Sequence, residues 1–194
     1  MAGGASSRMG RDKGLMLLNG KTLAEHQLEK LNSLSLDPYI SSNNPSYQRF
    51  GPPVFTDKIT QIGPAGGIIT MLESITEESM LIIPCDLPFL PVSLLRELLE
   101  HYRGEDVLIP HWNGYPEPLV GIYHRRALPV FSRMVEQGAY KLAQILKEMN
   151  TGYLEITEKA YPGAGVWFTN INTPADLEKA AQLIDSLQQG KGDI

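Results

Sequence analysis

The first thirteen residues of the chain combine small, hydroxyl-bearing and basic side chains in a pattern that suits the binding of a polyphosphate. Gly3, Gly4 and Gly10 let the backbone approach a ligand closely and point successive N–H groups at one anion, because glycine has no Cβ. Arg8 and Lys13 add positive charge. The same composition is typical of a disordered basic N-terminus, so composition alone leaves a phosphate-binding loop and an unstructured end as alternatives.

Two aspartates follow segments that we predict to be strands. Asp86 comes just after the apolar run 80–83, and Asp57 follows the short run 53–56. In a parallel sheet, loops gather at the carboxyl ends of the strands, and a carboxylate there can bind Mg²⁺, which prefers oxygen ligands and substrate phosphates. The alternative for each aspartate is a structural role as the cap of the next helix or turn.

The spacing within the N-terminal stretch differs from that of the two best-known glycine motifs, since Lys13 follows Gly10 by three positions. The arrangement A-G-G-x-S-x-R-M-G-x-D-K over residues 2–13 resembles the N-terminal signature of nucleotidyltransferases with the nucleotide-diphosphosugar transferase fold. It is most similar to the molybdenum cofactor guanylyltransferases (the molybdopterin-guanine dinucleotide biosynthesis protein A family). The Ala-Gly-Gly start and the Asp12–Lys13 pair favour the guanylyl members over the cytidylyl ones. A closing Asn-x-Asn-Thr-Pro element at 170–174 extends the resemblance to both ends of the chain.

This resemblance implies a single three-layer, Rossmann-like α/β domain with a mostly parallel sheet over residues 1–187, followed by a polar tail at 188–194. It implies GTP as the donor, Mg²⁺ as the cofactor and molybdopterin carrying molybdenum as the acceptor. Proteins that deliver or receive the cofactor are further expected partners. Two rivals stay open: another nucleotidyltransferase of this fold, acting on cytidylyl or sugar-phosphate substrates, and a non-catalytic nucleotide-binding protein.

The resemblance also assigns roles to individual residues. Arg8 and Lys13 would offset charge on the leaving pyrophosphate, and Asp86 matches the metal-binding aspartate of the family. Asp57 matches a second acidic position at the nucleotide site. The remaining expected nucleotide-binding residues are Met1, Ala2, Gly3, Gly4, Ser41 and Asn43. For the Asn-rich segment 41–44, a simple turn is the alternative.

The composition fits one globular domain. A chain of 194 residues can bury a full core, and the net charge of −5 argues against nucleic-acid binding, which normally requires a basic face. No apolar run approaches the roughly 20 residues that a membrane helix needs. Cys85 is the only cysteine, which fits a reducing cytoplasm, and nothing nearby would activate it as a nucleophile.

Helical and strand patterns alternate along the chain, as in an α/β domain. Thr22 and Glu25 form a capping-box pattern at the start of a helix over 22–34. We predict further helices near 63–73, 91–102, 125–135, 139–149 and from 174 onward, and strands at 38–41, 53–56, 80–83, 107–109, 118–123 and 152–157. The segment 112–117 is predicted to be a turn-rich loop.

One expectation concerns the start of the chain. In the family resembled here, the Ala-Gly-Gly turn follows an apolar strand in the middle of the sheet, and Met1 stands where the last residue of that strand belongs. We therefore expect a central strand to be absent from this sequence, with an apolar segment upstream of Ala2 in the native protein. The alternative is that another segment takes its place.

Overall fold

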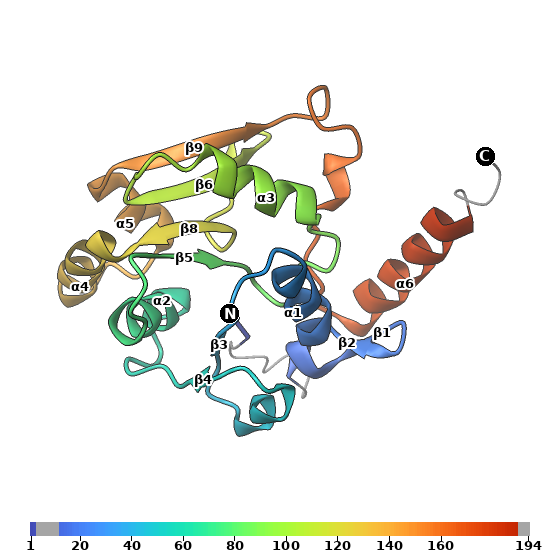
Figure 1. The fold of residues 1–194 in the computed structure, drawn as a ribbon, viewed down its shortest axis with the longest axis horizontal. Coiled ribbons are helices and arrows are strands. Elements are labelled where there is room, and N and C mark those ends of the chain that lie inside the picture. The colour runs from blue at the N-terminus through green and yellow to red at the C-terminus, as the bar shows by residue number, and fades with distance from the viewer. Residues whose placement is uncertain (3–11, 190–194) are drawn as a thin grey trace.

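The computed structural model describes residues 1–2 and 12–189, and side chains as far as residue 186. It confirms an α/β fold (Figure 1). The helices are α1 (Leu23–Ser33), α2 (Pro64–Ser74), α3 (Val92–His101), α4 (Leu128–Glu136), α5 (Leu142–Ile145) and α6 (Pro174–Gln189). Short 3₁₀ turns include η1 (Lys13–Leu15), η2 (Pro45–Phe50) and η4 (Leu146–Glu148). Among the described helices, none combines the length and apolar character that crossing a membrane takes.

The main sheet is mixed. It contains β5 (Ser79–Ile82), β8 (Gly121–His124), β6 (Val107–Trp112) and β7 (Tyr115–Pro116) in that order, with β9 (Thr151–Ile156) on β6. The β6–β9 pair is parallel, whereas β8 runs antiparallel to both β5 and β6. Two smaller pairs lie apart from it: the hairpin β1 (Leu17–Leu18) and β2 (Lys21–Thr22), and the parallel pair β3 (Ile40–Ser41) and β4 (Val54–Phe55).

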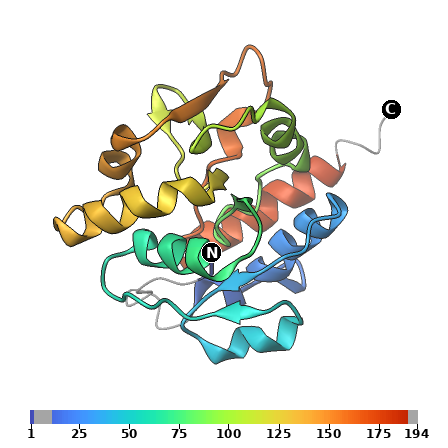
Figure 2. The ribbon, with the colours of Figure 1, turned by 60° about the vertical axis from the view of Figure 1, so that its left-hand side comes forward.

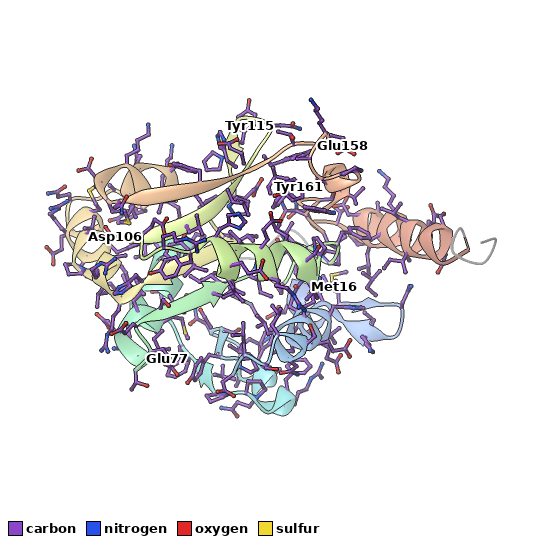
Figure 3. The ribbon with its side chains drawn as sticks, turned by 45° about the horizontal axis from the view of Figure 1, so that its top comes forward. Met16, Glu77, Asp106, Tyr115, Glu158 and Tyr161 are labelled. Carbon is purple, nitrogen blue, oxygen red and sulfur yellow. The ribbon has the colours of Figure 1, made fainter. Side chains whose placement is uncertain are left out.

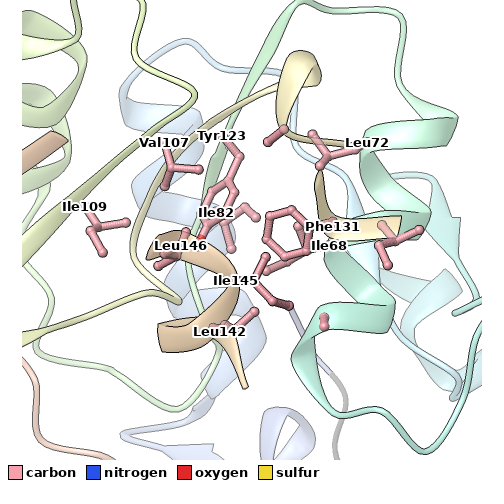
Figure 4. Packing of buried hydrophobic residues seen from close by; sticks show 13 residues of the cluster. Ile68, Leu72, Ile82, Val107, Ile109, Tyr123, Phe131, Leu142, Ile145 and Leu146 are labelled. Carbon is pink, nitrogen blue, oxygen red and sulfur yellow. The ribbon is translucent and has the colours of Figure 1, made fainter. Parts of the chain in front are cut away.

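Helices cover the sheet on both sides, which produces three layers. On one side Phe131 of α4 packs with Ile68 of α2 and with Val107 and Tyr123 of the sheet (Figure 4). Successive strand residues point to opposite faces. Leu108, next to Val107, therefore points to the other face of the sheet. There it packs in a second cluster of buried side chains, in which α3 supplies most of the helical ones.

The capping box predicted for α1 is present. Thr22 accepts a hydrogen bond from the Glu25 amide, and the Glu25 carboxylate accepts one from the Thr22 amide. The helices predicted near 63–73 and from 174 onward also form, with Pro64 and Pro174 as the first residues of α2 and α6.

Two strand pairs were not expected. The β1–β2 hairpin turns at Asn19-Gly20, and β7 pairs with the end of β6 through a turn at Asn113-Gly114. The loop predicted over 112–117 is therefore wrong: it is a short hairpin, with Tyr115 exposed near its tip (Figure 3). The predicted helix over 139–149 is shorter, consisting of α5 and the turn η4.

Met1 and Ala2 lie between β3 and β5 (Figures 1 and 2). The α-ammonium of Met1 donates to the Ile83 carbonyl at 3.0 Å, and the Cys85 amide donates to the Met1 carbonyl at 3.1 Å. On the other side, the Ala2 amide donates to the Ser41 carbonyl at 2.9 Å. These bonds follow the parallel ladder pattern, so the two residues occupy a strand position.

The space between β3 and β5 continues beyond Met1 as a cavity of about 300 Å³. Segments 36–39 and 79–83 border it within the layer of the strands. Leu31 of α1 closes it from one helix layer, and Met71 of α2 together with Ile75, the C-cap of α2, closes it from the other. Apart from the position that Met1 and Ala2 occupy, no strand in the part of the chain that the structure describes lies between β3 and β5. Within those residues, no other segment takes the central position.

Candidate active site

A cavity of about 740 Å³ gathers most of the predicted site residues. It lies where the chain leaves β3, β4 and β5, which are the strand ends from which site residues were expected. Arg8, Gly3 and Gly4 fall outside the described residues. Ala2 is buried and lines a smaller adjoining pocket. The predicted residues that line the large cavity are Met1, Lys13, Ser41, Asn43, Asp57 and Asp86.

Lys13 begins the 3₁₀ turn η1. Its ammonium donates to the Asn172 Oδ1 atom at 2.5 Å and lies 3.7 Å from the Asp86 Oδ2 atom. The Lys13 and Asp86 side chains are 25% and 23% exposed, so both are partly shielded yet open to a ligand. The structure thus brings together a cation and a carboxylate predicted from distant parts of the sequence.

Asp86 lies in the turn after β5. Its backbone carbonyl accepts a hydrogen bond from the Ile171 amide at 2.9 Å, which ties this turn to the Asn-x-Asn-Thr-Pro segment near the C-terminus. The next helix, α3, has Pro91 at its N-cap. A helix-capping role for Asp86 is therefore wrong, and its carboxylate faces Lys13 instead.

Asp57, Ser41 and Asn43 form one hydrogen-bonded group. The Ser41 hydroxyl and the Asn43 amide donate to the Asp57 carboxylate at 3.3 and 3.4 Å, and the Asp57 amide donates back to the Asn43 Oδ1 atom at 2.9 Å. The neighbouring helix α2 approaches this group through Gly67, where an added Cβ would lie 2.9 Å from the Ser41 Oγ atom. Any larger residue at position 67 would disturb the group.

The donor set suits a hard divalent cation. Asp86 and Asp57 offer carboxylate oxygens on the wall of a cavity large enough for a nucleotide. Within residues 1–2 and 12–189, no group of three His, Cys, Asp or Glu side chains could hold a metal by itself. This arrangement suits a divalent cation that is bound through one or two carboxylates together with substrate phosphates and water.

Cys85 also borders the cavity, but burial raises the pKa of its thiol to about 12. The thiolate is the nucleophilic form of cysteine, so this side chain stays inert near neutral pH. The expectation that Cys85 takes no part in covalent chemistry agrees with its surroundings.

Two polar residues at the site were not predicted as functional: Asn172, which holds Lys13, and Tyr47, which donates to the carboxylate of Asp12. Asn44, from the Asn-rich segment 41–44, donates to the same carboxylate. Asn172 belongs to the closing element that the sequence resemblance included, so that element was a usable signal. Nothing local marks Tyr47, which reaches Asp12 only through the fold.

Comparison with known proteins identifies the family. The family model described as the MobA-like NTP transferase domain matches residues 1–152. The chain belongs to this family. A curated relative from Vibrio parahaemolyticus, named molybdenum cofactor guanylyltransferase, is 34% identical over 188 residues, covering 94% of this chain and 93% of the relative. A protein of the same name from Aliivibrio fischeri is 32% identical over 189 residues, covering 95% and 94%.

Solved structures agree with this membership in the MobA-like family. Molybdopterin-guanine dinucleotide biosynthesis protein A from Archaeoglobus fulgidus matches with a TM-score of 0.77 and 28% identity, covering 95% of this chain and 96% of that one. A CMP:2-keto-3-deoxy-manno-octonic acid synthetase complexed with CTP matches with a TM-score of 0.70 at 16% identity, covering 90% and 92%. At that identity the second likeness concerns the fold alone.

Proposed function

We propose that the chain transfers GMP from GTP to the terminal phosphate of molybdopterin carrying molybdenum, releasing pyrophosphate and forming the guanine dinucleotide form of the cofactor. The observation that carries this proposal is the Lys13 ammonium, held between Asn172 and Asp86 on the wall of the 740 Å³ cavity. The names of the curated relatives support the choice of guanine and of molybdopterin.

In the reaction, an oxygen of the acceptor phosphate attacks the α-phosphorus of GTP. The bond from that phosphorus to the oxygen bridging to the β-phosphate breaks, and pyrophosphate leaves with the bond electrons. No covalent intermediate on the protein is needed, so the protein contributes positioning and charge stabilisation. Lys13 and Arg8 would offset the negative charge that grows on pyrophosphate, and the amides of Gly3 and Gly4 would bind phosphate oxygens.

Asp86 would hold Mg²⁺. When bound, the ion would neutralise phosphate charge and favour displacement at the α-phosphorus. The carboxylate of Asp86 and the ammonium of Lys13 lie close enough to act on one phosphate group from two sides. Their ion pair also keeps the lysine beside the carboxylate before any nucleotide binds.

The nucleoside would lie against the group formed by Ser41, Asn43 and Asp57, next to Met1 and Ala2. A guanine base and a ribose need both donors and acceptors, and this group offers hydroxyl, amide and carboxylate functions. The hydrogen bonds within it restrict these side chains before the ligand arrives.

The reaction would take place in the cytoplasm, where a lone thiol stays reduced, and proteins that deliver or receive the cofactor would be its partners. The test is a turnover assay with the chain, magnesium, molybdopterin loaded with molybdate, and either GTP or CTP. We expect pyrophosphate in many-fold excess over protein with GTP only. Product with CTP would favour the cytidylyl rival, and tight GTP binding without product would favour a non-catalytic binding protein.

A further inference from the structure

Within residues 1–2 and 12–189, three donors hold the carboxylate of Asp12, the residue directly before Lys13. Its Oδ1 atom accepts from the Gly14 amide at 3.1 Å and from the Tyr47 hydroxyl at 2.5 Å, and its Oδ2 atom accepts from the Asn44 side-chain amide at 2.9 Å. Asp12 is also the N-cap of η1, the turn that carries Lys13. The carboxylate therefore fixes the backbone from which the lysine side chain extends.

None of these three donors is charged. The Lys13 ammonium lies against Asn172 and Asp86 rather than against the adjacent carboxylate of Asp12. A carboxylate beside a lysine is an obvious counter-ion for it. Because neutral hydrogen bonds satisfy the Asp12 carboxylate, the lysine charge remains directed into the cavity.

Tyr47 is a rigid donor. Its side chain is fully buried, and it packs in one cluster with Ala24 and Ile40. Burial, together with the hydrogen bond to Asp12, raises the pKa of the Tyr47 hydroxyl far above its usual range, so the group keeps its proton. A buried phenol of this kind can only donate to the carboxylate.

The turn η2 (Pro45–Phe50) presents both Tyr47 and Asn44. Asn44 is its N-cap and accepts a hydrogen bond from the Ser46 amide at 3.0 Å, which leaves the side-chain nitrogen of Asn44 free to donate to Asp12. The residue before it, Asn43, bonds to Asp57 in the group assigned above to the nucleoside. One short segment thus joins the two halves of the cavity.

We propose that Tyr47 and Asn44 are positioning residues for Lys13, which act by clamping Asp12 and so aiming the lysine at the phosphates of the nucleotide. This inference rests on the proposed function, because that function gives Lys13 its task. The close fit at Gly14 supports it: an added Cβ there would lie 2.1 Å from the Tyr47 hydroxyl oxygen, so any side chain at position 14 would block the clamp.

The test removes one hydroxyl. Tyr47→Phe keeps the ring and should lower kcat/KM for nucleotide transfer roughly tenfold, as expected when a charge partner in the transition state is misplaced. The matched control is Tyr161→Phe. The Tyr161 hydroxyl also donates to a carboxylate at 2.5 Å, that of Glu97 on α3, but Tyr161 does not line the 740 Å³ cavity. The control should leave kcat/KM unchanged.

A double-variant cycle separates positioning from a general loss of stability. If Tyr47 acts through Lys13, then Tyr47→Phe should change kcat/KM less than about twofold once Lys13→Ala is present. Asn44→Ala removes another donor to the Asp12 carboxylate, and its effect on kcat/KM should likewise be small once Lys13→Ala is present. Multiplied losses in either double variant would overturn the proposal, as would a Tyr47→Phe protein with normal kcat/KM.

The same cycle can be measured as the affinity for magnesium pyrophosphate, by calorimetric titration. This affinity depends neither on the acceptor nor on the base of the nucleotide. Pyrophosphate affinity should fall several-fold in Tyr47→Phe only while Lys13 is present. If that holds while the wild-type chain makes no guanine dinucleotide, the proposed function fails and the positioning role stands. Equal losses with and without Lys13, or wild-type protein that does not bind pyrophosphate, would refute the positioning role.

Discussion

Filling the cavity between β3 and β5 with an extended apolar segment should stabilise the protein. The perturbation is a five-residue extension, Thr-Val-Ile-Ile-Val, joined by a peptide bond ahead of Met1. Met1 and Ala2 already pair with Ile83, Cys85 and Ser41 in the ladder pattern of a parallel strand. The extension would continue that ladder into the cavity, between the facing edges of the two strands.

The expected gain in stability follows from the length of β5, Ser79–Ile82. A strand lying alongside β5 would place about four residues in the cavity. Burying four apolar side chains contributes on the order of 6–12 kcal/mol. Ordering the backbone of four residues costs about 4–8 kcal/mol. The midpoints of these two ranges leave a net gain of about 3 kcal/mol before any ladder hydrogen bond is counted. For a chain of this size, that raises Tm by roughly 6–12 °C.

The measurement is thermal unfolding followed by circular dichroism and calorimetry, on the chain with and without the extension. The matched control is an extension of the same length, Gly-Asp-Gly-Asp-Gly, which adds chain but cannot fill an apolar cavity. If the apolar and the acidic extensions give the same Tm, the cavity does not accept a strand and the argument from the facing edges is refuted.

Three further predictions concern the site and the buried terminus. Lys13→Ala should reduce single-turnover transfer by on the order of 10² with an unchanged Tm, because it removes charge stabilisation from the transition state; a normal rate would exclude Lys13 from the chemistry. Asp86→Asn should strongly lower magnesium-dependent turnover and leave Tm almost unchanged, because a metal ligand is lost. Normal turnover with a lowered Tm would indicate a structural role. Burial lowers the pKa of the Met1 α-ammonium below its usual 8.0, so the unfolded chain binds the proton more tightly and Tm should rise as pH is raised toward 8. Any extension ahead of Met1 replaces this amine with an amide and should remove that slope.

Features encoded by neighbouring residues were the predictable part of this fold. The α1 capping box needs only Thr22 and Glu25, three positions apart, and it formed as expected. Two hairpins were missed although both turn at Asn-Gly, at residues 19–20 and 113–114, each with positive φ at both positions. Asn-Gly between short β-leaning runs is a strong hairpin signal. The strands β1, β2 and β7 are only two residues long, which hid the alternation that identifies a strand.

The direction of β8 could also have been predicted. Residues 113–120 connect β6 to β8, and a parallel crossover requires a dozen or more residues. The short connection forces the chain to turn back, so β8 runs antiparallel to β6. By contrast, β9 follows two helices and pairs parallel to β6.

At the site, the types of residue were predictable and most of their partners were not. Lys13 and Asp86 were selected because phosphoryl chemistry needs a cation and a metal ligand, and the structure brings them within 3.7 Å. The contact between Lys13 and Asn172 spans 159 positions of sequence. Likewise, Tyr47 looks like an ordinary core residue until the fold places its hydroxyl on Asp12. Such partners depend on tertiary packing and carry no local pattern.

The central cavity and the candidate site share two lining residues, Met1 and Ser41, which links stability to binding. Met1 lines both the 300 Å³ cavity between the strands and the 740 Å³ cavity that holds Lys13 and Asp86. A segment seated between β3 and β5 would restrain Met1 and Ala2, the two residues that lead into the glycine-rich stretch. We therefore expect the apolar extension to tighten binding of magnesium pyrophosphate several-fold as well as to raise Tm, since less ordering would be left for the ligand to impose. Calorimetric titration of the apolar and acidic extensions tests this link, and equal affinities despite a raised Tm would show that the strand position and the phosphate site are independent.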